Sequence, residues 1–178
     1  MRLLLRLVTL LLLLFNCPAS VDAQLRCSDR YRKNTDSSIS DPIIVRTCYL
    51  QGFRFRETAY PDYAGRYVHS DHAVWKLVKG RYVRSSNEDI FNARGAALLA
   101  TINRCIRQEW QQNRADSNMR ECLADVPQPP EYGMNDLDIS FQDKEVWFSV
   151  SWGLPGACRA ADGAIITFPL KEVMPYLK

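Results

Sequence analysis

The sequence of 178 residues has only two histidines and no recognisable catalytic signature. It has no paired C-x-x-C spacing of the kind that indicates a zinc or redox site. It also has no basic block, because 23 Lys and Arg are scattered against 20 Asp and Glu and leave a formal net charge of +3. Such a balance gives no support for nucleic-acid binding or for a basic membrane patch. We therefore expect a protein that is not an enzyme and that holds no cofactor and no metal.

Long apolar runs are also scarce, since one stretch from Leu7 to Phe15 is the only one of note. It is too short to cross a bilayer core of about 30 Å. Arg2 and Arg6 flank it, and small residues ending at Ala23 follow it. These are the parts of a secretory signal peptide, so residues 1–23 are expected to be cleaved from a periplasmic or secreted bacterial protein with no membrane span left after cleavage.

Five cysteines follow the expected cleavage site, namely Cys27, Cys48, Cys105, Cys122 and Cys158. Exported cysteines usually pair, and an odd number leaves one over. The pairs we favour are Cys27 with Cys48 and Cys105 with Cys122, which leave Cys158 as a free thiol. Other pairings are compatible with the sequence.

The stretch from Trp75 to Trp110 carries the clearest structural pattern. Apolar residues flank a turn at Lys79-Gly80, which predicts a hairpin. Ser85 precedes Glu88 at capping-box spacing, so a long helix is expected to begin near Asn87. Apolar residues then recur at intervals of three, four and seven up to Trp110, which predicts one buried helix face.

The remaining segments predict strands around this helix. Residues 24–42 are polar and are expected to form an irregular lead-in. Residues 43–178 are expected to form one domain, with a bent strand from Ile43 to Thr58, a second hairpin from Leu137 to Trp152 and a last strand from Ala164 to Phe168. The expected fold class is α+β, with an antiparallel sheet of two hairpins packed on one long amphipathic helix and with a short C-terminal helix.

Several short motifs resemble one known family. They are Tyr63 to His69, Trp75-Lys76-Leu77 with Gly80, Asp89-Ile90-Phe91 before the helix, Leu137 to Trp152, Gly163 to Pro169 and Val173 to Leu177. In these the chain resembles the domain-of-unknown-function family found at the C-terminus of the lysozyme-binding anti-sigma factor RsiV and of some secreted polysaccharide deacetylases. The resemblance implies a binding or accessory domain of the cell envelope, with a protein partner such as a lysozyme-like peptidoglycan hydrolase.

Aromatic residues outside the expected core are the strongest candidates for a partner site, because Tyr and Trp are enriched at interfaces. The predicted partner-binding residues are Tyr60, Tyr63, Tyr67, His69, His72 and Trp147. The segment from His69 to His72 also offers imidazole and carboxylate groups suited to metal or acid–base chemistry. We prefer to interpret it as a surface loop whose polar groups bind their neighbours.

Two alternatives remain open at this stage. The first is a small cell-wall hydrolase that uses the carboxylates of Asp136 and Asp138, or the Cys158 thiol with His69 or His72. Convergence of these side chains in one pocket would favour it. The second is a structural envelope protein joined to another chain through Cys158.

Overall fold

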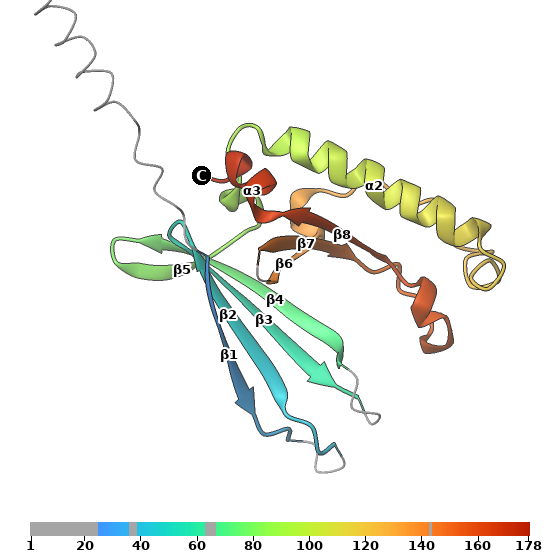
Figure 1. Ribbon diagram of the computed structural model, residues 1–178, viewed down its shortest axis with the longest axis horizontal. Helices are drawn as coiled ribbons and strands as arrows, with labels where there is room; N and C mark the ends of the chain where they lie inside the picture. The colour runs from blue at the N-terminus through green and yellow to red at the C-terminus, as the bar shows by residue number, and fades with distance from the viewer. Residues whose placement is uncertain (1–24, 36–38, 63–66, 143) are drawn as a thin grey trace, which may run out of the picture.

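The computed structural model describes residues 25–35, 39–62, 67–142 and 144–178 of the chain. The expected signal peptide, residues 1–23, therefore lies outside the described residues. The fold is α+β with antiparallel sheets, as expected, but its strands form two sheets instead of one (Figure 1).

The first sheet has five antiparallel strands in chain order. They are β1 (Arg26–Arg32), β2 (Ile43–Leu50), β3 (Phe53–Pro61), β4 (Tyr67–Val78) and β5 (Arg81–Ser85). The expectation of an irregular lead-in is wrong for β1. All seven of its residues are exposed, so no alternating apolar pattern marks it in the sequence. Pairing with β2 holds it in place.

Two tight turns shape this sheet. Gln51 and Gly52 have φ of 48° and 79°, and Lys79 and Gly80 have φ of 49° and 77°. Positive φ at both central residues is typical of the hairpin turn whose twist matches the flanking strands. The hairpin predicted at Lys79-Gly80 is confirmed, whereas the single bent strand expected from Ile43 to Thr58 is in fact the β2–β3 hairpin.

The second sheet has three antiparallel strands, β6 (Asp138–Gln142), β7 (Glu145–Val150) and β8 (Ala164–Pro169). The predicted second hairpin and last strand are confirmed by these bounds. Short 3₁₀ segments border the sheet, namely η2 (Met134–Asp136) and η3 (Gly156–Ala161). The chain closes with α3 (Leu170–Val173) and η4 (Met174–Tyr176), which confirms the expected short C-terminal helix.

The long helix α2 spans Gly95–Ala115, so the predicted start near Asn87 is wrong. A separate 3₁₀ turn, η1 (Glu88–Ile90), comes first. The Asp89 carboxylate accepts hydrogen bonds from the hydroxyls of Ser85 and Ser86, in place of the expected contact with Glu88. The chain between η1 and α2 then runs beside the C-terminal segment, where the Asn92 amide donates to the carbonyls of Pro175 and Leu177. These contacts delay the start of the helix.

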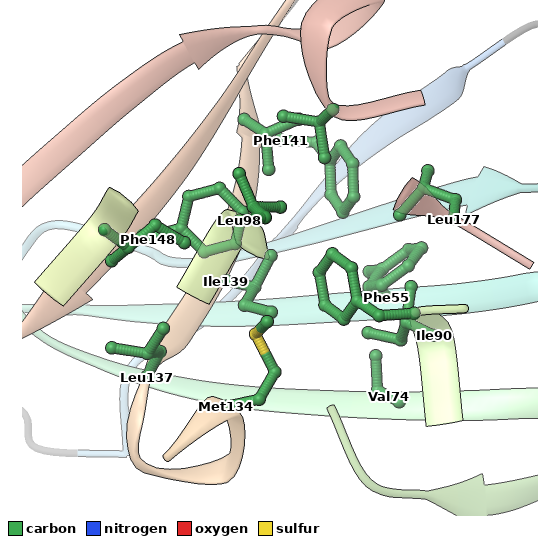
Figure 2. Packing of buried hydrophobic residues seen from close by; sticks show 14 of the residues in the cluster. Phe55, Val74, Ile90, Leu98, Met134, Leu137, Ile139, Phe141, Phe148 and Leu177 are labelled. Atoms are coloured by element: carbon green, nitrogen blue, oxygen red, sulfur yellow. The ribbon is translucent and has the colours of Figure 1, made fainter. Parts of the chain in front are cut away.

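One hydrophobic core joins both sheets and the helix (Figure 2). Phe55 of the first sheet and Phe141 of the second have ring centroids 4.4 Å apart. Leu98 and Ile102 place the buried face of α2 in the same cluster, as the helical spacing predicts. Phe148 at the centre of β7 is fully buried. The helix also buries Asn103, which exchanges two hydrogen bonds with the backbone of Tyr132.

Two disulfides hold the outer parts of the fold. Cys27 pairs with Cys48, which confirms that prediction. The predicted pair of Cys105 and Cys122, with Cys158 free, is wrong, because Cys122 pairs with Cys158 and Cys105 is the free thiol among the described cysteines. The ten residues from Cys105 to the end of α2 span about 15 Å of helix. Cys122 lies beyond that end and bonds to Cys158 in η3.

Candidate interaction surface

Polar side chains link the two sheets on the side of the first sheet that faces the core. Arg46 on β2 pairs with Asp29 on β1 at 2.9 Å, and it also donates to the side chain of Gln142 on β6. The hydrogen bond from the Arg46 guanidinium lowers the pKa of Asp29. On the neighbouring strands, Glu57 and His72 lie opposite one another in β3 and β4.

His72 lies between two carboxylates. Its Nδ1 is 3.2 Å from Oδ1 of Asp138 and its Nε2 is 3.8 Å from Oε1 of Glu57. The Nδ1 contact is an ion pair without an aligned hydrogen bond. Burial lowers the pKa of His72, but the two carboxylates outweigh burial and raise the pKa to about 9. The imidazole is therefore protonated at neutral pH, and the arrangement acts as an ion-pair link between β3, β4 and β6.

The described side chains of the hydrolase alternative are not gathered into one site. Asp138 pairs with His72, whereas the Asp136 carboxylate accepts a hydrogen bond from the Gly133 backbone N–H at 2.7 Å. Cys158 is oxidised in a disulfide and offers no thiol nucleophile. A protonated His72 is also no general base. Within the described ranges, no group of three potential metal-binding side chains is positioned to hold an ion.

The aromatic residues predicted to bind a partner are divided between the two sheets. Tyr60 on β3 donates a hydrogen bond from its hydroxyl to Asp71 at 3.0 Å, which raises the pKa of Tyr60. Trp147 lies on β7 and donates from its indole to Glu145 at 3.1 Å. Tyr63 falls outside the described residues, and for Tyr67 and His69 the structure describes only the backbone, as part of β4. The partner-binding role of these residues and of the enclosed His72 stays a prediction.

A different surface emerges on the outer side of the first sheet. Successive side chains along a strand point to opposite faces. Cys48, Phe55 and Val74 lie side by side in register and belong to the core. The residues next to them in sequence therefore point outward, and so do the β5 residues paired with outward positions of β4. We call this surface the arginine–aromatic face and define it by Tyr49, Arg54, Arg56, Trp75, Tyr82 and Arg84.

Strand register brings these residues together. Tyr49 on β2 lies opposite Arg54 on β3, Arg54 lies opposite Trp75 on β4, and Trp75 lies opposite Arg84 on β5. The result is one row in which aromatic and cationic side chains alternate across four strands. Residues from 49 to 84 thus become neighbours through hairpin pairing alone.

The guanidinium groups of this face gather around one indole ring. Cζ of Arg54 is 4.3 Å from the Trp75 ring centroid, and those of Arg56 and Arg84 are each 5.1 Å away. Arg54 also lies 4.9 Å from the Tyr82 ring, which in turn packs 5.9 Å from Tyr49. Such contacts stabilise a cation over an aromatic face by about 0.5–2 kcal/mol each. They hold three cations close together despite their mutual repulsion.

In the described structure, no carboxylate forms a salt bridge with these three cations, Arg54, Arg56 and Arg84. The side chains of Arg56 and Arg84 are exposed, and Arg54 is half-buried. A shallow hollow of about 270 Å³ continues the face toward β1, lined by Arg30 together with Tyr49, Arg54 and Arg56. The face is therefore a local concentration of positive charge on a protein of low net charge.

Sequence reasoning missed this surface because it treated the arginines as scattered and solvated. The alternation of arginine with buried residues is visible in the sequence of β3, since Arg54 and Arg56 flank the buried Phe55. What the sequence did not show was register, which decides that Arg84 from another hairpin lies beside the same indole. The signal that identifies such a face is the presence of arginine and aromatic residues at outward positions of neighbouring strands.

No helix of the described ranges has the length and apolar character needed to span a membrane. Comparison with known families, curated proteins and solved structures finds no match to this chain.

Proposed function

We propose that this protein is a non-enzymatic binding protein of the bacterial cell envelope, exported by its N-terminal segment, and that it holds its partner on the arginine–aromatic face. The observation that carries the proposal is the set of three guanidinium groups around Trp75 without a carboxylate partner in the described structure. Arg, Tyr and Trp are the residues most enriched where binding energy is concentrated at interfaces. The two disulfides are typical of an oxidising compartment.

The core supports a single-domain scaffold for this face. In our proposal the hairpins and the long helix form one rigid unit from residue 43 to the C-terminus, to which β1 adds an edge. The continuous hydrophobic cluster that joins both sheets to α2 favours this view. A rigid sheet reduces the entropy that binding costs, because the side chains that contact a ligand are already positioned.

The sign of the charge restricts the partner. A positive face repels a strongly basic protein, so within a hydrolase-binding role it favours an acidic hydrolase over a basic lysozyme. The same argument favours any partner that presents carboxylate, sulfate or phosphate groups, since guanidinium donates two parallel hydrogen bonds to such groups.

A capture experiment tests the binding role. The purified protein, the variant Arg84→Glu and the matched control Arg81→Glu are immobilised and exposed to envelope extract. Arg81 is exposed on the same strand, three residues from Arg84 and on the opposite side of the alternation. We expect the protein and the control to retain the same envelope components and Arg84→Glu to lose them. Equal retention by all three baits would exclude the face as the binding surface, and retention by none would exclude the binding role.

A further inference from the structure

The hairpin of β4 and β5 extends past the rest of the first sheet. Strand β3 begins at Phe53, which lies opposite Lys76, so β4 continues beyond the end of its neighbour. The turn before β3 reaches as far as Leu77, whose N–H donates to the Gly52 carbonyl at 2.8 Å. We call the chain from Leu77 to Val83 the hairpin tip. Figure 1 shows it projecting away from the core.

Apolar side chains are exposed on both faces of the hairpin tip. Leu77 lies opposite Tyr82, and both share the outward face with Trp75. Val78 and Val83 alternate with them and therefore point to the other face. The exposed fractions of these side chains are 45% for Leu77, 44% for Val78, 36% for Tyr82 and 52% for Val83. A flat partner covers one face of a sheet, whereas burial of all four side chains needs a medium or a groove that encloses the tip.

Cations stand among these apolar side chains. They are Lys76, Lys79, Arg81 and Arg84. No Asp or Glu occurs between Asp71 and Glu88, and none of the four cations makes a salt bridge within the described ranges. Acidic residues elsewhere offset this local excess in the net charge of +3, so the low net charge does not exclude a basic patch here. A partner of the tip must be negatively charged and must also accept apolar side chains.

The surface of an anionic bilayer meets both requirements. Its phosphate groups lie directly above the acyl chains, so cations and apolar side chains a few ångströms apart each find a suitable environment. Lys and Arg bury their aliphatic stems and keep the charged ends among the headgroups, and tyrosine rings such as that of Tyr82 favour the same depth. A soluble polyanion would leave the apolar side chains in water. An apolar protein groove would bury the cations without partners, which is unfavourable.

We propose that the hairpin tip inserts into the headgroup region of an anionic phospholipid bilayer and attaches the protein to the membrane surface. Its apolar side chains enter the upper part of the acyl region, and Lys79 and Arg81 bind lipid phosphates. The inference goes beyond the proposed function, because it adds a second attachment site next to the arginine–aromatic face. Arg84 follows the tip directly and belongs to that face, so a partner held there lies close to the membrane. Vesicle binding weakens as salt screens the cations.

Binding to lipid vesicles tests the inference. The protein is used without residues 1–23, because their apolar run would bind lipid by itself. Sedimentation measures its binding to mixed vesicles of phosphatidylglycerol and phosphatidylcholine and to vesicles of phosphatidylcholine alone, and its binding to soluble polyphosphate is measured in parallel. We expect the anionic vesicles to bind at least about tenfold more tightly than the neutral vesicles and, per phosphate group, than polyphosphate.

Two variants separate charge from apolar contact. Lys79→Asn should weaken binding to the anionic vesicles about fivefold, since it removes one cation while asparagine tolerates the positive φ of the turn. Val78→Ser with Val83→Ser should weaken it about tenfold or more, because the inserted apolar area is lost. The controls change an exposed cation on α2 and an exposed apolar residue on β8, namely Arg104→Glu and Ile165→Ser. Each control should change binding less than about twofold.

Three results would overturn the inference. Binding that the double valine variant does not weaken, or equal binding to polyphosphate, would assign the tip to polyanions in general. Loss of envelope components by the valine variant, without binding to any vesicle, would assign the tip to a protein groove. Absence of vesicle binding, with envelope capture still sensitive to Arg84→Glu, would exclude the membrane site and leave the proposed function intact. Vesicle binding sensitive to both tip variants, with capture insensitive to Arg84→Glu, would support the membrane site and contradict the proposed function alone.

Discussion

His72 places a charge at the junction of the two sheets. Its pKa is raised from 6.5 to about 9, so the protonated imidazole stabilises the folded state fully below pH 6.5, and this contribution is lost as the pH rises through about 9. We predict that His72→Gln lowers the free energy of unfolding by about 1–3 kcal/mol near pH 6.5, because Glu57 and Asp138 then lose their shared cation. The variant should also lack the fall in stability between pH 6.5 and 9.

Chemical denaturation at a series of pH values measures both effects. The control is the double variant His72→Gln with Asp138→Asn, in which one of the two unpaired carboxylates is removed. It should recover part of the lost stability and remain insensitive to pH in the same range. An unchanged fall in stability in His72→Gln would show that another group causes it.

At the scale of single elements, Gly163 controls the entry into β8. Its φ is +97°, and a Cβ there would lie 2.0 Å from the carbonyl oxygen of Val150. Backbone atoms cannot yield as a flexible side chain can, so Gly163→Ala is expected to cost about 2–4 kcal/mol of unfolding free energy. Gly156→Ala is the matched control, since nothing lies within 4 Å of a Cβ at Gly156. Thermal denaturation of both variants checks the difference, and equal stability would contradict this geometry.

The disulfides give a second prediction at this scale. Peptide mapping without reductant should yield the pairs Cys27–Cys48 and Cys122–Cys158, with Cys105 open to alkylation after unfolding. Cys158→Ser should lower the free energy of unfolding by about 2–4 kcal/mol, because it opens a loop of 36 residues. Cys105→Ser should change it by less than about 1 kcal/mol. A linked Cys105–Cys122 peptide would restore the pairing expected from the sequence.

Elements with a local signal were predictable, and those that depend on distant contacts were not. The Lys79-Gly80 turn and the apolar face of α2 are properties of a few neighbouring residues. By contrast, β1 is exposed throughout and is a strand only because it pairs with β2. The start of α2 is delayed by Asn92 hydrogen bonds to residues more than eighty positions away. Neither effect leaves a periodic pattern in the sequence.

At the scale of the whole molecule, the binding surface depends on how the hairpins align. Tyr60 and Trp147 were chosen for their residue type, and the fold places them on different sheets. The arginines were passed over because their charges almost cancel against acids elsewhere in the chain. The net charge of the sequence differs from the net charge of one face, because strand register decides which charged residues share that face. The sequence therefore predicted the class of fold better than the location of its surface chemistry.

The most direct measurement is a heteronuclear NMR titration of the protein with a soluble acidic polymer, followed through the indole signals of its four tryptophans and the side-chain signals of its arginines. Binding on the arginine–aromatic face should shift the signals of Trp75, Arg56 and Arg84 together. The indole signals of Trp110 and Trp147 should stay in place, because these residues lie on α2 and on the second sheet. Shifts centred on Trp147 with Trp75 unmoved would contradict the assignment of the binding surface to the first sheet.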